Sequence, residues 1–395
     1  MHEEKYKTYT FDNVVLFART GLNPRDNFKL GQGNNKYITI KNIQNNELIF
    51  DKNTDVVDDD AIKLIHKRSQ IQKGDILFAS IGRIGDMYII QDEPNGWDIN
   101  ESVFAFTLNT KIIQQKYFYY IFKNQTTLDY LKNNSSGSTF KSIKMNQLKR
   151  MTFLLPSLEE QNRISLKLDK CNKIINNYKR IIEKYDMLIK SRFIEMFGDP
   201  ITNPKHWNTK AITELCENIM GGGTPSKSKP EYFEGTIPWV SPKDMKSLFI
   251  LDSQDHITED AVNNSSAKKI KSDSILMVIR SGILKHTLPV AMNKVEVTIN
   301  QDMKAFIPSS EINPYYLLFY FKGIERDVLS GVRAVTADNI DFNQFKKRHV
   351  ILPPKQMQDD FASFVQQIDK SKFVVQQSLE KVELFYKSLM QEYFG

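Results

Sequence analysis

The chain has 395 residues, of which 41% are hydrophobic, and a formal net charge of +7 at pH 7. This length suits two domains with connectors, and the basic charge permits a polyanionic partner. The longest apolar runs, Ile275–Ile279 and Tyr315–Phe321, are too short for a membrane-spanning helix. The N-terminus lacks a signal-peptide pattern, and two cysteines without CxxC spacing favour a cytoplasmic protein and argue against a zinc site.

The first segment, residues 1–156, predicts a globular domain of mixed helices and strands. Alternating or continuous apolar patterns at 37–40, 76–81 and 102–108 favour short strands. A single amphipathic helix is expected near 114–132.

Several expected loops of this segment combine basic residues with small, hydrogen-bonding ones. Arginine and lysine on loops can bind guanine edges or phosphates, and serine and threonine can bind either. Each such loop is more often a simple solvated turn, so these residues are candidates only. The DNA-binding candidates of this segment are Lys41, Arg83, Ser138, Thr139, Lys141 and Lys144.

The next segment, residues 157–198, shows the strongest periodicity in the chain. Ser157 and Glu160 resemble a capping box, and a helix of about 50 Å should follow at ~1.5 Å per residue. Apolar residues then recur at steps of four and three, which predicts a heptad seam. The seam residues are Ile164, Leu168, Cys171, Ile175, Tyr178, Ile182, Tyr185 and Ile189. A second apolar row, Ile174, Ile181 and Leu188, predicts that a helical partner subunit docks there.

Residues 199–353 predict a second globular domain, because scaffold positions of the first domain recur. Ile99-Asn100 matches Ile299-Asn300, and Tyr37 corresponds to Trp239. An amphipathic helix is expected near 313–329, and Ser330–Thr336 is expected to be a loop like Ser136–Lys144. The candidates for DNA contact here are Thr224, Ser226, Lys227, Lys243, Arg280, Ser281, Arg333 and Thr336.

Residues 354–395 repeat the long helix at a constant offset of 197 positions. Leu155-Pro156 matches Leu352-Pro353, and Gln161 matches Gln358. Lys372 is the one polar residue in the second seam. The equivalents of the second apolar row are Ser371, Ser378 and Phe385, of which only Phe385 is apolar. The sequence therefore predicts an α+β fold with an internal two-fold repeat: two globular mixed α/β domains separated by two long antiparallel coiled-coil helices.

Familiar catalytic motifs are missing from the sequence. There is no GxxxxGK[ST] phosphate loop, no HExxH and no Cys/His cluster with metal spacing. Gly221-Gly222-Gly223 lacks the context of a phosphate loop and is interpreted as a turn. We therefore expect a binding protein with no catalytic or metal-ligating residue, and an enzyme with an unfamiliar active site stays open as an alternative.

Several motifs resemble the specificity subunits of type I restriction-modification systems. The strongest match is GGGTPSKSKPEYFEGTIPWVSPKDM at 221–245, with reduced forms at 21–28 and 37–43. Both Leu-Pro…Gln helix entries and the junction Phe197–Pro200 also resemble that family. The resemblance covers nearly the whole chain and departs from the family at Lys372 and in the reduced glycine-rich motif of the first domain.

The resemblance implies that each globular domain recognises one half of a bipartite site on double-stranded DNA. It further implies that the helices set the spacer and dock two methyltransferase subunits, which use S-adenosylmethionine. Two motor-endonuclease subunits, using ATP and Mg²⁺, are a further partner that the sequence leaves open. The chain itself would bind no cofactor and catalyse no reaction. A stand-alone DNA-binding or regulatory protein on the same scaffold is the alternative.

Overall fold

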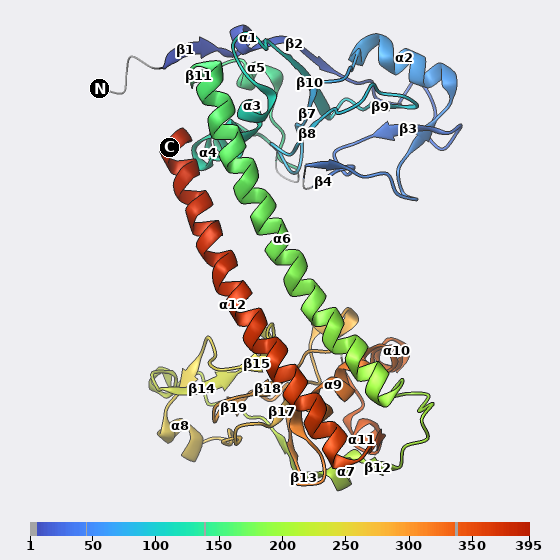
Figure 1. Cartoon of the computed structure of the whole chain (residues 1–395), viewed down its shortest axis with the longest axis vertical. Helices are drawn as coiled ribbons and strands as arrows, with labels where there is room; N and C mark the ends of the chain where they lie inside the picture. Colours follow the sequence, from blue (N-terminus) through green and yellow to red (C-terminus); the bar gives the residue numbers. More distant parts are fainter. Residues whose placement is uncertain (1–5, 45, 138–139, 336–338) are drawn as a thin grey trace. The chain divides into compact units, whose positions relative to one another are not determined.

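The structure is a computed structural model that describes residues 6–44, 46–137, 140–335 and 339–395, with only the backbone described for 332–335. It divides into two compact units, one formed by Met1–Asn177 with Ser378–Gly395 and the other by Tyr178–Gln377 (Figure 1). Each unit therefore combines one globular domain with a segment of both long helices. Ser138, Thr139 and Thr336 lie outside the described residues.

Unit 1 is built on an antiparallel sheet with the order β2-β10-β7-β8. Its strands are β2 (Val15–Thr20), β10 (Val103–Leu108), β7 (Ile76–Ala79) and β8 (Met87–Ile89). A smaller sheet contains β6 (Val56–Val57), β3 (Asn35–Ile38) and β9 (Trp97–Ile99). Two further strand pairs are β1 (Lys7–Thr10) with β11 (Thr152–Leu155), and β4 (Ile43–Gln44) with β5 (Glu47–Leu48). The short helices are α1 (Phe11–Val14), α2 (Asp59–Ser69), α3 (Gln115–Ile121), α4 (Gln125–Asn133) and α5 (Met145–Leu148).

Unit 2 repeats this plan with an extra strand, in the order β13-β20-β17-β18-β15. These strands are β13 (Cys216–Gly221), β20 (Met303–Pro308), β17 (Ile275–Val278), β18 (Val290–Asn293) and β15 (Phe249–Ile250). The smaller sheets contain β16 (His256–Ile257), β14 (Ile237–Val240) and β19 (Thr298–Ile299), and β12 (Thr209–Ala211) with β21 (His349–Ile351). The helices are α7 (Ile212–Leu215), η2 (Pro230–Phe233), η3 (Pro242–Asp244), α8 (Glu259–Asn263), η4 (Gly282–Lys285), α9 (Pro314–Gly323), α10 (Glu325–Val335) and α11 (Phe342–Phe345).

The central strands are apolar throughout because both faces of the main sheet are covered. All four residues of β7 are buried, and so are all four of β17. In unit 1, Phe78 packs in the cluster that includes α3 and α6, whereas Leu77 packs with the smaller sheet. In unit 2, Met277 packs in the cluster that includes α6 and α9, whereas Leu276 packs with the smaller sheet. Two-sided burial thus explains strands without polar alternation.

Three sequence-based expectations about short helices are wrong. The single helix expected near 114–132 is two helices, α3 and α4, because Asn124 has extended backbone angles and is the N-cap of α4. The helix expected near 313–329 is also two, α9 and α10, divided at Ile324. The expected loop at 330–336 is helical up to Val335, so Arg333 belongs to the last turn of α10.

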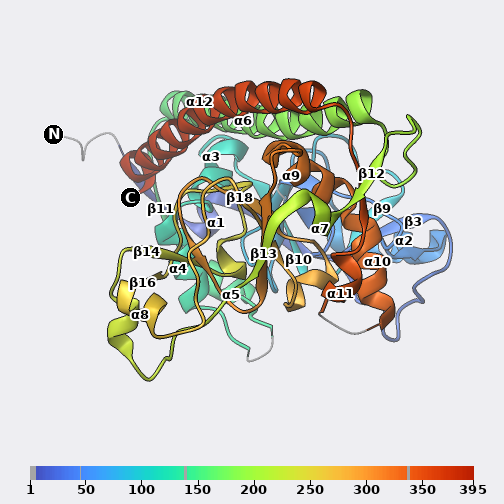
Figure 2. The same ribbon diagram turned by 90° about the horizontal axis from the view of Figure 1, so that it is seen from below.

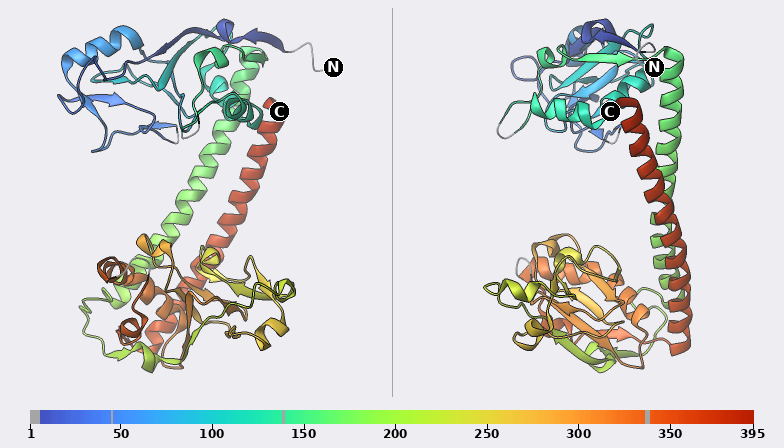
Figure 3. Two further views of the ribbon diagram at one scale, coloured as in Figure 1. Left: turned by 180° about the vertical axis from the view of Figure 1, so that it is seen from behind. Right: turned by 90° about the vertical axis from the view of Figure 1, so that its left-hand side faces the viewer.

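The two long helices are α6 (Leu158–Phe197) and α12 (Lys355–Phe394), each of 40 residues. Their segments lie side by side in opposite directions within each unit (Figure 3). In unit 2 the rings of Phe193 and Phe361 meet with centroids 5.5 Å apart, and the ring of Tyr316 on α9 stacks on that of Phe193. Figure 2 shows α9 next to the long helices on the side of its domain. The antiparallel helix pair is confirmed in both units.

The heptad seam is confirmed, since every seam residue of both helices is buried or half-buried. Lys372, the polar exception, is accommodated by an ion pair between its Nζ and Oδ1 of Asp186, 2.5 Å apart. The lysine side chain is only 23% exposed. An ion pair across the seam therefore replaces one layer of apolar packing in unit 2.

Each long helix is fastened to its domain by a buried glutamine. The Gln161 amide is fully buried, accepts from the N–H of Gln114 at 3.0 Å and donates to the carbonyls of Pro156 and Ile112. Gln358 accepts from Asn313 N at 2.9 Å and donates to Pro353 O at 2.8 Å. These bonds satisfy the N–H of the N-cap residue of α3 or α9. They also satisfy a proline carbonyl just before the long helix. The Leu-Pro…Gln pattern is thus a structural joint.

Candidate nucleic-acid interface

A glycine directly after the first strand of each main sheet, β2 or β13, lets the chain lie against the backbone that precedes β10 or β20. A Cβ on Gly222 would lie 1.8 Å from the carbonyl oxygen of Asn300, and one on Gly21 would lie 1.7 Å from that of Ile99. No side chain fits in either place. The first domain therefore keeps this part of the glycine-rich signature, although its sequence there looks reduced.

An aromatic side chain fixes the residue that follows this glycine. Trp239 on β14 donates from Nε1 to the carbonyl of Gly223 at 3.0 Å, and Tyr37 on β3 donates from its hydroxyl to the carbonyl of Leu22 at 2.6 Å. Burial raises the pKa of the Tyr37 hydroxyl, with Glu101 adding to the shift, so the group stays protonated as a donor. The two domains share this loop support while their loop sequences differ.

In unit 2, two of the predicted residues contact one turn, Asn300–Asp302, and a third lies next to one of them in the chain. Thr224 hydrogen-bonds Gln301, and Arg280 forms an ion pair with Asp302 in the next position of the same turn, with Nη2 and Oδ1 2.5 Å apart. Ser281 follows Arg280 and accepts from Ile283 N at 3.4 Å. Gln301 and Asp302 were not predicted from the sequence, since an Asn-Gln-Asp turn carries no motif by itself.

Three further candidates of unit 2 have described side chains: Lys243, Ser226 and Lys227. Lys243 lies in η3 and pairs with Asp255, with Nζ and Oδ2 2.8 Å apart. Ser226 shares a hydrogen bond of 2.7 Å with Ser228, and Lys227 between them is exposed. The loop that follows Thr224 is thus a separate polar surface.

In unit 1, Lys41, Arg83 and Lys141 belong to neighbouring loops. Arg83 donates from Nη2 to the carbonyls of Ile40 and Ile43, at 3.1 and 2.7 Å, and its Nε lies 3.1 Å from Oδ2 of Asp86. Lys41 follows Ile40, while the carbonyl of Lys141 accepts from Gly82 N at 2.9 Å. Arg83 therefore links its own loop to the loop around Ile40 and Ile43. Lys41 and Lys141 nearby are exposed and better placed to contact a ligand. Lys144 is exposed at the N-cap of α5.

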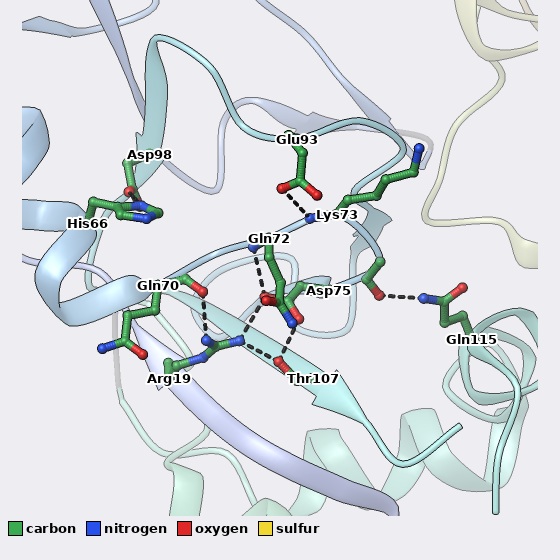
Figure 4. A network of polar contacts seen from close by, with 11 residues as sticks. Arg19, His66, Gln70, Gln72, Lys73, Asp75, Glu93, Asp98, Thr107 and Gln115 are labelled. Carbon is green, nitrogen blue, oxygen red and sulfur yellow. Dashed lines mark hydrogen bonds and ion pairs between the residues drawn. The ribbon is translucent and has the colours of Figure 1, made fainter. Parts of the chain in front are cut away.

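Unit 1 also contains a polar network that the sequence did not predict (Figure 4). Nη2 of Arg19 on β2 lies 2.7 Å from Oδ2 of Asp75, whose other oxygen accepts from Thr107 at 2.6 Å. The carbonyl of Gln70, at the end of α2, accepts from Arg19 at 2.6 Å. Isolated charged residues in strand patterns give no signal for such contacts. This network joins the end of α2 to strands β2 and β10.

Next to this network, Asp98 is buried beneath the last turn of α2. Its carboxylate lies 3.0 Å from Nδ1 of His66 and accepts from Ile99 N at 2.7 Å. Burial raises the pKa of Asp98, and hydrogen bonds from Ser69, Ile99 and His66 oppose the shift. The contact is internal, so we assign it to stability of the domain.

The predicted docking residues on the long helices are exposed. The exposed fractions are 42% for Ile174, 37% for Ile181, 47% for Leu188 and 57% for Phe385. Met187, directly before Leu188, is 67% exposed, and Leu384, directly before Phe385, is 70% exposed. The pairs Met187-Leu188 in unit 2 and Leu384-Phe385 in unit 1 occupy equivalent repeat positions. Unit 2 carries a further exposed apolar pair on α12, Phe373-Val374, at 63% and 61%.

Neither a metal site nor a membrane span is found in the described part of the chain. No group of three or more His, Cys, Asp or Glu residues there could hold a metal ion. None of its helices is both long and apolar enough to cross a bilayer.

Comparison with known proteins finds the same protein family in both halves of the chain. The family model for the type I restriction modification DNA specificity domain matches twice, at residues 3–184 and 204–384. The chain belongs to this family of DNA specificity domains. Its two copies correspond to the two halves of the internal repeat.

Named members of the family agree with this assignment. The MjaIX specificity subunit of Methanocaldococcus jannaschii is 27% identical over 353 residues, which cover 85% of this chain and 80% of that protein. The EcoR124I/EcoR124II specificity subunit of Escherichia coli is 48% identical over 114 residues, but the match spans only 28% of that relative. The S subunit from M. genitalium has a TM-score of 0.59 at 16% identity, covering 99% of this chain and 96% of that one, and supports the fold.

Proposed function

We propose that this chain is the specificity subunit of a type I restriction-modification complex, and that each domain recognises one half of a bipartite DNA site. The observation that carries the proposal is the double match to a DNA specificity domain, one match in each structural unit. Because the two domains share a scaffold but present different loop residues, each can select a different base sequence. We assign residues 1–156 and 199–353 as the two recognition domains, and 157–198 and 354–395 as the spacer helices.

The chemistry of the loops supports DNA as the ligand. The net charge of +7 provides phosphate contacts that are independent of sequence and weaken with salt. Exposed cations with hydrogen-bonding neighbours can read base edges or fix the register on phosphates. For the first domain we propose contacts from the group around Arg83, and for the second from the cluster of Thr224, Arg280 and Ser281. Indirect recognition of DNA shape would add to these contacts.

The long helices offer a surface for the catalytic partners. Exposed side chains as large as Leu384 and Phe385 on a helix are typical of sites that another protein covers. The pairs Met187-Leu188 and Leu384-Phe385 stand at equivalent repeat positions, one in each unit, which supports two methyltransferase subunits, one beside each domain. S-adenosylmethionine would then bind to those partners, and ATP and Mg²⁺ to motor-endonuclease subunits if present. The complex would act on DNA in the cytoplasm.

The first test is genome-wide mapping of methylated adenine in the host, with and without this gene. We expect methylation to disappear at one gapped, bipartite motif when the gene is deleted. Unchanged methylation, together with no methyltransferase copurifying with the full chain, would contradict the proposal and favour the stand-alone DNA-binding protein. Turnover of DNA by the isolated chain would instead favour an enzyme.

A further inference from the structure

Arg280 is held in a fixed orientation at the end of β17. Its Nε donates to Oδ1 of Asp302 at 2.6 Å, and its Nη2 lies 2.5 Å from the same oxygen. The backbone joins the same two residues, since the N–H of Arg280 bonds to the carbonyl of Asp302 at 3.2 Å. The arginine and its partner are thus fastened at both the main chain and the side chain.

Asp302 is itself held in position by the turn that precedes β20. Its N–H donates to Oδ1 of Asn300 at 3.1 Å, and its Oδ2 lies 3.4 Å from the Asn300 amide nitrogen and 3.5 Å from that of Gln301. Asn300 is only 7% exposed, so the turn is anchored in the domain. A carboxylate fixed in this way restricts the rotamers of the arginine that it binds.

The outer edge of this guanidinium remains available. The Arg280 side chain is 56% exposed, whereas that of Asp302 is 23% exposed. Both contacts to Asp302 use Nε and Nη2, and among the described residues no acceptor is bonded to Nη1. The Nη1–Nη2 edge therefore presents two parallel donors, which is the geometry that matches O6 and N7 of guanine in the major groove.

The equivalent place in unit 1 has no such pair. The isolated bridge of Ile81 with Ser142 corresponds to that of Arg280 with Asn339. Ser102 takes the place of Asp302, because its carbonyl accepts from Ser80 N at 3.0 Å as that of Asp302 accepts from Ile279 N at 2.9 Å. A feature that only one of two equivalent scaffolds carries is not required by the fold. It is therefore suited to a role in only one half of the DNA target.

We propose that Arg280 reads a guanine in the half-site bound by the second domain, and that Asp302 is the residue that positions it. This inference rests on the proposed function and adds to it the base and the two residues. An exposed ion pair by itself contributes little to stability, so selection for base contact explains the doubly fixed geometry better than stability does. Fixing the arginine before binding also lowers the entropy that is lost on recognition.

The test uses the full chain in its complex and a library of DNA duplexes in which each half of the wild-type site is randomised in turn. For Arg280→Lys, which keeps the charge but loses the fork, we expect preference for guanine at one position of one half-site to fall on the order of tenfold to hundredfold. For Asp302→Asn we expect a smaller loss at the same base. The double variant should be no worse than Arg280→Lys alone, because Asp302 acts through the arginine.

Lys271→Ala is the matched control. Its side chain is also 56% exposed, and it pairs with Glu217 just before the start of β17, at the other end of the strand from Arg280. It should lower affinity equally for all sequences or not at all. The inference is overturned if Arg280→Lys leaves base preference unchanged or weakens all sequences alike. It is also overturned if Asp302→Asn and Arg280→Lys have additive effects. A wild-type complex that selects no bipartite site would contradict the proposed function itself.

Discussion

At the scale of residues, buried polar side chains link the long helices to the domains through hydrogen bonds to backbone groups. Gln161 and Gln358 show this most clearly, because both are fully buried and both bond to backbone groups that would otherwise lack partners. Leaving such groups unsatisfied in a protein interior costs more than the bonds themselves contribute.

For Gln161→Ala we therefore expect the free energy of unfolding to fall by about 1–3 kcal/mol, since the N–H of Gln114 and the carbonyls of Ile112 and Pro156 lose their partner. Thermal unfolding of the full chain measures this. Asn162→Ala, at the exposed neighbouring position of α6, is the control and should change little. Equal stability of the two variants would show that water replaces the amide.

Asp98 gives a prediction about pH. Burial raises its pKa, so the folded chain holds this proton more tightly than the unfolded chain does. Its contribution to stability is therefore complete below the ordinary aspartate pKa and is lost as pH rises through the raised value. For Asp98→Asn we expect stability relative to the wild type to increase from about pH 4 to pH 7. Thermal unfolding across this range measures the difference.

Asp60→Asn is the control for this pH series. Asp60 lies on the same helix, α2, with a side chain that is 96% exposed. Its stability difference from the wild type should not follow the trend expected for Asp98→Asn. A flat difference for Asp98→Asn as well would mean that its carboxyl is not protonated over this range.

At the scale of elements, the seam of the long helices contains one departure from apolar packing. Lys372 pairs with Asp186 across the helices of unit 2, at a position where the first helix has an isoleucine in its own repeat, Ile175. The free energy lost when the two charged groups of a partly buried ion pair are dehydrated can exceed the free energy gained from their attraction. We therefore expect an apolar residue at position 372 to give a more stable protein.

Lys372→Leu should accordingly raise the free energy of unfolding by about 1 kcal/mol. Asp186 can then be solvated, because its side chain is 50% exposed. Thermal unfolding is the measurement, and Lys370→Leu on the exposed face of α12 is the matched control. A loss of stability in Lys372→Leu alone would show that the ion pair fixes the register of the helices.

At the scale of the whole molecule, the repeat predicts that recognition is modular. Each unit has its own main sheet and its own buried clusters, so one domain can be replaced without disturbing the core of the other. Exchanging residues 199–353 for another recognition domain should change only one half of the DNA target. Mapping of methylated adenine measures this, and a change in both halves would contradict recognition by independent domains.

The spacer role of the helices gives a second prediction at this scale. Deleting four residues from the exposed middle of α6 removes about 6 Å of helix and shifts the heptad seam relative to α12. We expect a different number of base pairs between the half-sites, or loss of binding. The control replaces the same four residues with alanine and keeps the length. Unchanged spacing after the deletion would exclude the helices as the ruler.

Local pattern and repetition in the sequence determined the duplicated α+β plan, both long helices and their seam. These follow from periodicity and a constant offset, which depend only on neighbours along the chain. The motifs also gave the family and thereby the two recognition domains. The division of the short helices at Asn124 and Ile324 was not predicted, because a single capping residue inside an apolar pattern is only a weak local signal.

Only the tertiary structure decided how the candidate residues are used. Arg83 and Arg280 look alike in sequence, yet Arg83 is tied to the carbonyls of Ile40 and Ile43 while Arg280 is held outward by Asp302. The buried roles of Gln161 and the Arg19–Asp75 pair likewise depend on residues far away in the chain. Long-range pairing of strands and helices places these partners, and no local pattern contains that information.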